Sequence, residues 1–284
     1  MSSTIRCASE TAAQDERDAR VALMLQLADS AGELALRYFQ SDALTVSIKS
    51  DQSPVTQADT AIETLLRQRI HAHFPDDAIL GEEHGESSGA DTSTSHWRWI
   101  LDPIDGTVSF AAGVPLFGTL IALERNHLIE AGICAMPALR ERVWAARGQG
   151  AWWERIDVHG VAQRSAARVR NGATLANALL CTTGLEYFER SNTVAILVRV
   201  AQRAGRIRGW SDCYAGMLVA TGRADAWIDP VMHPWDSGPF PVIFEEANGV
   251  FTDWNGRCDI HGGSAVAAGA ALHRELLPLL RASS

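Results

Sequence analysis

Two closely spaced aspartates, Asp102 and Asp105, are the residues of this chain best suited to chemistry. They follow an apolar run at residues 97–101 that is typical of the end of a buried strand. Pro103 fixes φ between the two carboxylates, and Gly106 frees the backbone directly after them. The pattern therefore predicts a strand that delivers two carboxylates into a tight turn.

Polar residues after this turn favour a short helix. Thr107 and Ser109 can cap its first turn, so that its backbone N–H groups point at whatever the carboxylates bind. Hard oxygen ligands beside a helix N-terminus suit a divalent cation that carries a phosphate.

Further acidic residues lie at the ends of other predicted elements, where α/β proteins bind ligands. Glu82 and Glu83 follow a short strand. Asp59 lies in the first turn of one helix, and Asp236 opens another. Since no His or Cys pair lies at ligand spacing, these carboxylates favour Mg²⁺ or Mn²⁺ over zinc. Several converging carboxylates would suit a two-metal site that activates a water and screens a phosphate under in-line attack.

Each acidic residue also has a purely structural interpretation. The Asp-Pro-x-Asp-Gly sequence is a good turn in itself, and Glu82 and Glu83 could form a solvated loop. Asp236 could be only a helix cap, and Asp59 only half of a capping box. Taken singly, none of these residues establishes a site.

Spacing excludes several other phosphate and metal chemistries. Phosphatases of the haloacid dehalogenase type use Asp-x-Asp-Gly-Thr, and here the nucleophile position would fall on Pro103. The sequence contains no EF-hand pattern, no G-x-x-x-x-G-K-[ST] loop and no G-x-G-x-x-G stretch.

The elements that must position these groups follow from hydrophobic periodicity. The first half predicts a helix over Val21–Phe39 and a second helix opened by Thr56, with Asp59 in capping-box position. Its strands pair through short turns, which indicates a largely antiparallel sheet; they are expected at 78–81, 97–101, 118–123, 128–136, 143–146 and 151–153.

The second half alternates strands with helices, which favours an α/β lobe with helices on both faces of a sheet. Strands are expected at 179–182, 226–228, 250–252 and 265–268, and helices at 193–203, 211–221, 236–247 and from 272. The polar stretch 155–171 separates the halves. We therefore expect one catalytic domain over 20–284, with lobes at about 20–160 and 161–284.

Composition limits the class of protein. The 284 residues carry a formal net charge of −9, which argues against a nucleic-acid partner. Five cysteines without a C-x-x-C pair indicate neither a disulfide framework nor a zinc site, which suits a cytoplasmic protein. No run of about 18 apolar residues predicts a membrane span. Residues 1–19 are polar and are expected to form a flexible tail rather than a signal peptide.

The full set of motifs resembles the inositol monophosphatase family of metal-dependent, lithium-sensitive phosphatases. The motifs occur in the family's order, as Thr56-Gln57-Ala58-Asp59, Gly81-Glu82-Glu83, Trp99-Ile100-Leu101-Asp102-Pro103-Ile104-Asp105-Gly106-Thr107 and Pro234-Trp235-Asp236-Ser237-Gly238. The resemblance covers the chain from about Val21 to the C-terminal helix. It implies an α/β fold of layered αβαβα type, as in inositol monophosphatase and fructose-1,6-bisphosphatase, and a homodimer.

The resemblance also implies roles for individual residues. Two or three Mg²⁺ ions, or Mn²⁺, would be held by Glu82, Asp102, the carbonyl of Ile104, Asp105 and Asp236. Thr107 and Asp59 would orient the attacking water, and Glu83 would assist. The N–H groups of Gly106 and Thr107 would bind phosphate oxygens.

Within the family the chain is most similar to the histidinol-phosphate phosphatase branch, through segments at 52–56, 113–120, 212–214 and 221–225. Histidinol phosphate carries an amine and an imidazole, so its pocket should offer carboxylates. Asp229 lies where the family contacts the organic part of the substrate, and Asp212 lies in the preceding substrate segment, although it could also cap a helix. Arg208 could reach the phosphate or shape the pocket.

These features predict a Mg²⁺-dependent phosphomonoester hydrolase in which a water attacks phosphorus directly. Histidinol phosphate is the preferred substrate. The alternatives are a myo-inositol-1-monophosphatase or broad sugar-phosphate phosphatase, and a non-catalytic metal or phosphate sensor. The expected partner is a small phosphomonoester, with neither nucleic acid nor membrane.

Overall fold

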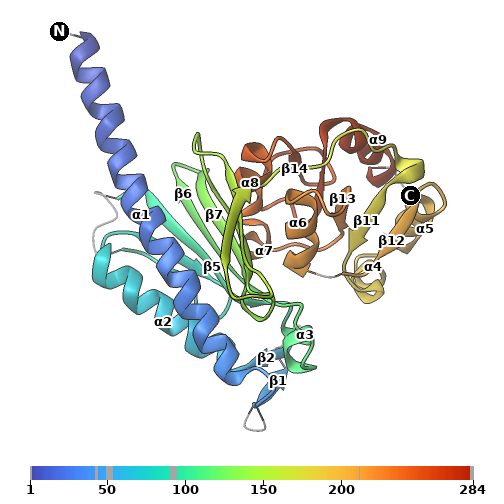
Figure 1. The fold of residues 1–284 in the computed structure, drawn as a ribbon, viewed down its shortest axis with the longest axis horizontal. Helices are drawn as coiled ribbons and strands as arrows, with labels where there is room; N and C mark the ends of the chain where they lie inside the picture. The colour runs from blue at the N-terminus through green and yellow to red at the C-terminus, as the bar shows by residue number, and fades with distance from the viewer. Residues whose placement is uncertain (1, 42–43, 49–53, 90–94, 211, 282–284) are drawn as a thin grey trace.

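Five layers of helix and sheet make up the computed structural model, which describes residues 2–41, 44–48, 54–89, 95–210 and 212–281, with side chains from residue 14 onward. Helices α1 (Ser2–Tyr38) and α2 (Gln57–His73) cover the outer face of a first sheet (Figure 1). A middle helix layer separates this sheet from a second, smaller one, and three further helices cover the far face. This arrangement confirms the expected αβαβα fold.

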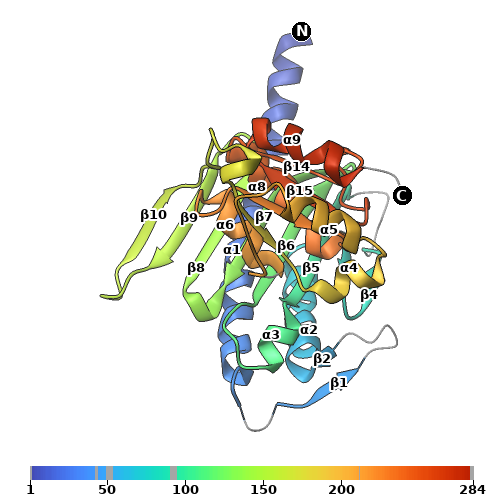
Figure 2. The same ribbon diagram turned by 90° about the vertical axis from the view of Figure 1, so that its right-hand side faces the viewer.

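The first sheet has eight strands in the order β10-β9-β8-β7-β6-β5-β3-β4, with β10 at one edge (Figure 2). Only the β3–β5 pair is parallel among the strands described, so the sheet is largely antiparallel as predicted. Its strands are β3 (Ala78–Gly81), β4 (Gly85–Ser87), β5 (Trp97–Asp105), β6 (Gly118–Arg125), β7 (Leu128–Met136), β8 (Glu141–Ala146), β9 (Ala151–Ile156) and β10 (Ala162–Ala166).

The second sheet has the order β12-β11-β13-β15-β14. Its strands are β11 (Leu179–Thr182), β12 (Arg206–Arg208), β13 (Ala226–Asp229), β14 (Val250–Thr252) and β15 (Ala265–Ala268). The middle layer contains α6 (Asp212–Ala220), α7 (Pro234–Ser237) and α8 (Phe240–Glu246), and the outer layer α4 (Leu185–Arg190), α5 (Val194–Ala201) and α9 (Ala270–Leu280). Helices therefore cover both faces of this sheet, as expected.

The middle layer packs very closely on the first sheet. At Gly132 of β7, an added Cβ would lie 2.5 Å from Cα of Pro239, at the start of α8. At Gly118 of β6, it would lie 2.7 Å from Sγ of Cys213 in α6. The absence of side chains at these two glycines lets both helices approach the sheet backbone.

Several local expectations were incomplete. The helix expected at 236–247 is two helices, α7 and α8, separated at Gly238 and Pro239. The sequence did not indicate the β1 (Val46–Ile48)–β2 (Pro54–Thr56) hairpin, α4, or the short edge strands β4 and β12. Part of the polar stretch expected between the lobes is β10, which extends the first sheet. The division into two lobes stays a prediction.

The flexible tail expected over residues 1–19 is helical from Ser2 onward. Arg20 explains where this helix is anchored: its guanidinium donates two hydrogen bonds of 2.8 Å to the buried Asp77, which also accepts one from Nε1 of Trp99. Phe74 and Trp97 lie against the same guanidinium. The helix that begins in this polar stretch is thus attached to the body of the protein at Arg20, directly after it.

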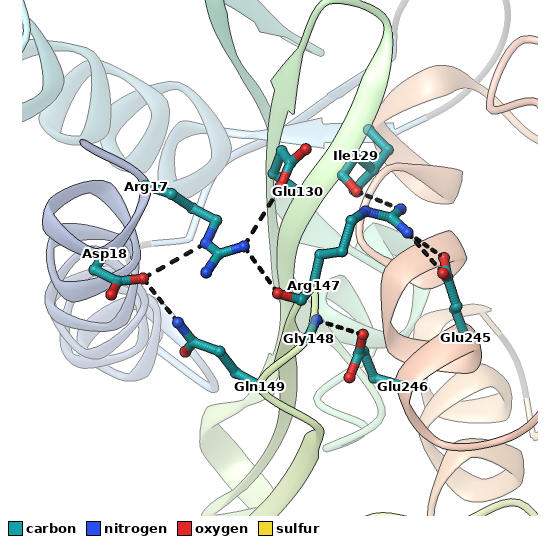
Figure 3. Close-up of polar contacts among 9 residues, drawn as sticks. All are labelled: Arg17, Asp18, Ile129, Glu130, Arg147, Gly148, Gln149, Glu245 and Glu246. Carbon is teal, nitrogen blue, oxygen red and sulfur yellow. Dashed lines mark hydrogen bonds and ion pairs between the residues drawn. The ribbon is translucent and has the colours of Figure 1, made fainter. Parts of the chain in front are cut away.

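A second polar network joins α1 to α8 across the turns of the first sheet (Figure 3). Arg17 donates to the carbonyl of Arg147, and the Arg147 guanidinium pairs with Glu245 of α8. Glu246 accepts the N–H groups of Gly148 and Gly150 at 2.7 and 2.8 Å. The three layers are therefore linked by charge as well as by packing.

No helix in the described part of the chain combines the length and apolar character needed to cross a lipid bilayer.

Candidate active site

The end of β5 brings Asp102 and Asp105 to a cleft of about 760 Å³. The pairing of β5 with β6 is irregular between these two residues, because Asp102 lies opposite Leu120 but Asp105 opposite Gly118. Pro103 lies within this bulge, where the regular pairing of the strands is already interrupted and proline's lack of an N–H costs little. Its carbonyl accepts the Thr119 hydroxyl at 2.9 Å. The bulge lets both carboxylates line the cleft.

Asp236 joins these two aspartates from the opposite side. It lies in the first turn of α7, where one carboxylate oxygen accepts the backbone N–H of His233 at 2.7 Å. Carboxylate oxygens of Asp102, Asp105 and Asp236 all lie within 4.8 Å of one another. Asp236 is thus both a helix cap and a member of the cluster.

The cluster fits a divalent cation. Oδ1 of Asp102 is buried and has no hydrogen-bond partner among the described residues, which is costly for a carboxylate unless a ligand satisfies it. Burial, together with neighbouring carboxylates, raises the pKa values of Asp102 and Asp105 well above their ordinary range and that of Asp236 to about 8. A bound cation would offset both effects.

Glu82 lies directly after β3, and its backbone N–H donates to the carbonyl of Leu101 at 3.2 Å. Its side chain lines the cleft, and its charge contributes to the raised pKa of Asp102. Glu83 is not among the residues that line the cleft; its backbone N–H donates to Glu63 instead. The structure therefore brings Glu82, but not Glu83, to the aspartate cluster.

Asp59 and Thr107 meet beside the cluster. The Thr107 hydroxyl lies 3.0 Å from the carbonyl of Ile104 and 3.4 Å from Oδ1 of Asp59. The other oxygen of Asp59 closes the predicted capping box with Thr56, whose N–H donates to it at 2.9 Å. Burial raises the pKa of Asp59. Asp59 therefore fulfils both interpretations, as a helix cap and as a partner of Thr107.

Gly106 begins α3 (Thr107–Ala111), which corrects the expectation that Thr107 and Ser109 cap this helix. Its φ is +84°, and an added Cβ would lie 2.8 Å from the carbonyl of Leu116 and 3.1 Å from Oδ2 of Asp212. Glycine is required here on both counts. The Thr107 hydroxyl instead contacts the carbonyl of Ile104 and Oδ1 of Asp59.

Asp212 begins α6 and lines the cleft beside Gly106. Its φ is +54°, an uncommon conformation for a residue other than glycine. The Thr183 hydroxyl lies 3.3 Å from Oδ1 of Asp212. This backbone conformation accompanies a hydrogen bond of 2.6 Å from the N–H of Cys213 to Asp105. Asp212 therefore lines the cleft, and its contact with substrate stays a prediction.

Asp229 lies at the end of β13 and is buried at the base of the cleft. Both of its oxygens accept protein hydrogen bonds, from the N–H of Thr183 at 3.0 Å and from Nε1 of Trp227 at 2.7 Å. Burial raises its pKa well above the ordinary range. Arg208 is exposed, donates to the carbonyl of Ile207 and is not among the lining residues. The structure does not bring Arg208 to the site.

The sequence analysis missed one wall of the cleft, which α4 supplies through Glu186, Tyr187 and Arg190. Beside Asp236, the rings of His233 and Trp235 stack with centroids 5.1 Å apart. Burial, and after it the neighbouring aspartates, raises the pKa of Tyr187. The sequence showed no clear sign of this wall, because the 6 residues of α4 are too few to show helical periodicity.

Comparison with known proteins agrees with this geometry. A model described as the inositol monophosphatase family matches residues 16–284. The chain belongs to the inositol monophosphatase family. As a member with an acidic cluster that fits a cation, it is a metal-dependent phosphomonoesterase.

Relatives within this inositol monophosphatase family include two proteins named histidinol-phosphatase. The one from Chlorobaculum parvum is 42% identical over 90% of this chain and 94% of its own length. The one from Mycobacterium tuberculosis is 38% identical over 92% of this chain and 97% of its own length. A protein from Mesorhizobium japonicum named inositol-1-monophosphatase is 31% identical, covering 93% and 97% of the two chains.

Solved structures share the fold. The extragenic suppressor protein suhB from Bartonella henselae has a TM-score of 0.82 at 28% identity, covering 94% of this chain and all of its own. An inositol monophosphatase/NADP phosphatase, described in complex with Mg²⁺ and phosphate, has a TM-score of 0.73 at 20% identity over 95% and 97% of the two chains.

Proposed function

We propose that this phosphomonoesterase hydrolyses L-histidinol phosphate to L-histidinol and phosphate. The observation that carries the proposal is the charge of the cleft. Beyond the aspartate cluster, the lining includes Asp212 and Glu186, whereas its basic residues among those described are Arg190 and His233. An organic group with a positively charged amine and an imidazole is the complement of such a wall. The similarity to two histidinol-phosphatases supports the same substrate.

The residues of the cluster would hold two or three Mg²⁺ ions, with Mn²⁺ as the alternative. We assign Glu82, Asp102, Asp105 and Asp236 through their carboxylates, and Ile104 through its carbonyl. These hard oxygen donors suit Mg²⁺. When bound, the cations lower the pKa of coordinated water and neutralise charge on the phosphate and the leaving alkoxide.

The chain's own groups then orient the reactants. We assign the Thr107 hydroxyl, which lines the cleft, and Asp59, which lies 3.4 Å behind it outside the lining, to orienting the attacking water; Asp59 can accept its proton through Thr107. The N–H groups of Gly106 and Thr107 would bind phosphate oxygens. Glu83, outside the cleft lining, is assigned to the turn that carries Glu82. The water attacks phosphorus directly, with no covalent enzyme intermediate.

Asp212 is the residue we assign to the organic part of the substrate, whereas Asp229 supports the wall behind it. Both oxygens of Asp229 are already engaged by Thr183 and Trp227, so a direct ionic contact with substrate would cost those bonds. Asp212 lies beside Gly106, next to the proposed phosphate position. A homodimer stays a prediction from the family resemblance, and a cytoplasmic location one from the cysteine content.

Phosphate release by the purified protein with Mg²⁺ tests the proposal. L-histidinol phosphate is compared with myo-inositol 1-phosphate, glycerol 2-phosphate and fructose 1,6-bisphosphate. A preference of ~100-fold in kcat/KM, about 2.7 kcal/mol, is expected for histidinol phosphate. Asp212→Asn should reduce this preference, while Asp259→Asn, at an exposed turn outside the cleft lining, should not. Faster hydrolysis of myo-inositol 1-phosphate would favour the alternative supported by the 31%-identical relative.

A further inference from the structure

Glu63 is a fully buried acid that the proposed chemistry does not use. It lies on α2 one turn after Asp59, with an exposed fraction of 0%, and is not among the residues that line the cleft. Burying a carboxylate is costly unless its oxygens are well satisfied. The partners of Glu63 therefore indicate what its burial achieves.

Those partners belong to the turn that follows Glu82. Oε2 of Glu63 accepts the backbone N–H of Glu83 at 2.7 Å, and Oε1 accepts the backbone N–H of His84 at 3.2 Å. Nδ1 of His84 also lies 3.3 Å from Oε1. One carboxylate on α2 thus holds the two residues directly after the proposed cation ligand.

Arg67 completes the attachment from the next turn of α2. Its Nε donates to Oε1 of Glu63 at 2.7 Å, which neutralises the buried charge. Its terminal nitrogens donate to the carbonyl of Gly85 and to the hydroxyl of Ser87. Arg67 and Glu63 together fix the chain from residue 83 to residue 87.

The residue before Glu82 also contacts Glu63. An added Cβ at Gly81 would lie 2.1 Å from Oε1 of Glu63, so the carboxylate packs against bare backbone. Glu82 itself is held to β5 by its N–H bond to Leu101. The backbone of Glu82 is therefore held through the residues before and after it, which contact Glu63, and by its own hydrogen bond to β5.

We propose that Glu63, supported by Arg67, is a positioning residue that sets the Glu82 carboxylate in place for the divalent cation. The inference rests on the proposed cation site. Ligands held rigidly by an outer layer of hydrogen bonds lose less freedom when they bind a metal, and removing such a partner lowers metal affinity by roughly 10–100-fold. Glu63 acts through the turn and touches neither substrate nor cation.

Glu63→Gln is the direct test, because the amide keeps the size of the side chain but presents an N–H₂ group to one of its donors. Glu124→Gln is the matched control: Glu124 is also buried and paired with an arginine, Arg98, but lies outside the cleft lining. The readouts are Mg²⁺ binding by titration calorimetry, and the Mg²⁺ concentration that gives half-maximal hydrolysis.

For Glu63→Gln we expect the dissociation constant for Mg²⁺ and the Mg²⁺ concentration for half-maximal hydrolysis to rise by roughly 10-fold or more. The kcat at saturating Mg²⁺ should stay within about threefold of the wild type. The control, Glu124→Gln, should lose thermal stability but keep the wild-type dissociation constant for Mg²⁺ and the wild-type Mg²⁺ concentration for half-maximal hydrolysis. Equal Mg²⁺ affinity in Glu63→Gln and the wild type overturns the positioning role. Absence of Mg²⁺ binding and hydrolysis in the wild type would instead overturn the proposed function.

Two further variants keep the test decisive where Glu63→Gln does not fold. Gly81→Ala displaces the Glu63 carboxylate from the other side, and Arg67→Lys keeps the charge but cannot reach Glu63, Gly85 and Ser87 together. Both should weaken Mg²⁺ binding in the same direction. Wild-type Mg²⁺ affinity in a folded Gly81→Ala variant contradicts the proposal.

Discussion

The backbone N–H of Cys213, in α6, donates a hydrogen bond of 2.6 Å to Oδ2 of Asp105, at the end of β5. The two residues belong to different layers, so this contact ties the first sheet to the middle helices at the cluster. It also engages one oxygen of Asp105, a residue that lines the cleft.

Asp105→Asn should lower kcat by on the order of 10³-fold while leaving the fold intact. The variant keeps the shape of the side chain and loses its charge. Since Asp105 is buried among like charges, which raise its pKa, the metal-free variant should unfold at the same temperature as the wild type or higher. Turnover equal to that of the wild type would remove Asp105 from the mechanism.

The metal-free protein should lose stability as the pH rises from about 4 to about 8. The folded-state pKa of Asp236 is about 8, against an ordinary value of 3.8, because burial and neighbouring carboxylates disfavour its charge. Between these values the folded state binds more protons than the unfolded state, so stability falls with increasing pH.

Excess Mg²⁺ should reverse this trend, because the cation binds the charged carboxylates. The rise in Tm on adding Mg²⁺ should therefore be larger at pH 8 than at pH 5.5, as measured by thermal unfolding with and without a chelator. Asp236→Asn should flatten the pH dependence of the metal-free protein. A Mg²⁺ effect independent of pH would show that these carboxylates are not the ligands.

Asp229→Asn should destabilise the protein by about 1–3 kcal/mol, because one amide N–H₂ then faces a donor, the N–H of Thr183 or the indole of Trp227. Substrate preference should change little. Denaturant unfolding and kcat/KM for histidinol and inositol phosphates check the two parts. A large change in preference without loss of stability would return Asp229 to direct substrate contact.

Arg20→Ala should destabilise the protein by about 3–5 kcal/mol, because it leaves the buried Asp77 carboxylate without its cation. The comparison variant is Arg17→Ala, whose ion pairs are longer and which should cost about 1 kcal/mol or less. Neither variant should alter the Mg²⁺ concentration for half-maximal hydrolysis. Equal effects of the two on denaturant unfolding would contradict the role given to Asp77.

The sequence was informative where structure depends on neighbours in the chain. The Thr56–Asp59 capping box, the strand ending in Asp102 and Asp105, and the helix cap at Asp236 all use residues within a few positions of one another. Their convergence was inferred from the order of motifs and is seen in the cluster of three aspartates.

Features that depend on distant partners could not be predicted in the same way. The burial of Glu63 requires a turn contributed by β3 and β4, and the engagement of Asp229 requires Trp227 and Thr183 in their folded positions. Likewise the polar start of α1 shows no apolar stripe, and the contact that holds the helix joins Arg20 to Asp77, 57 positions away in the chain. The sequence did hint at the burial of Glu63, because Glu63 is a charged residue on the largely apolar, buried face of α2.

The division of the aspartate cluster between β5 and α7 has a consequence for synthesis on the ribosome. Asp102 and Asp105 are translated long before Asp236, and the helix that carries Asp236 follows the second sheet's first strands. A nascent chain therefore carries an incomplete set of ligands until most of its length has emerged. Hydrolytic capacity would arise only at the end of translation, after both sheets can meet.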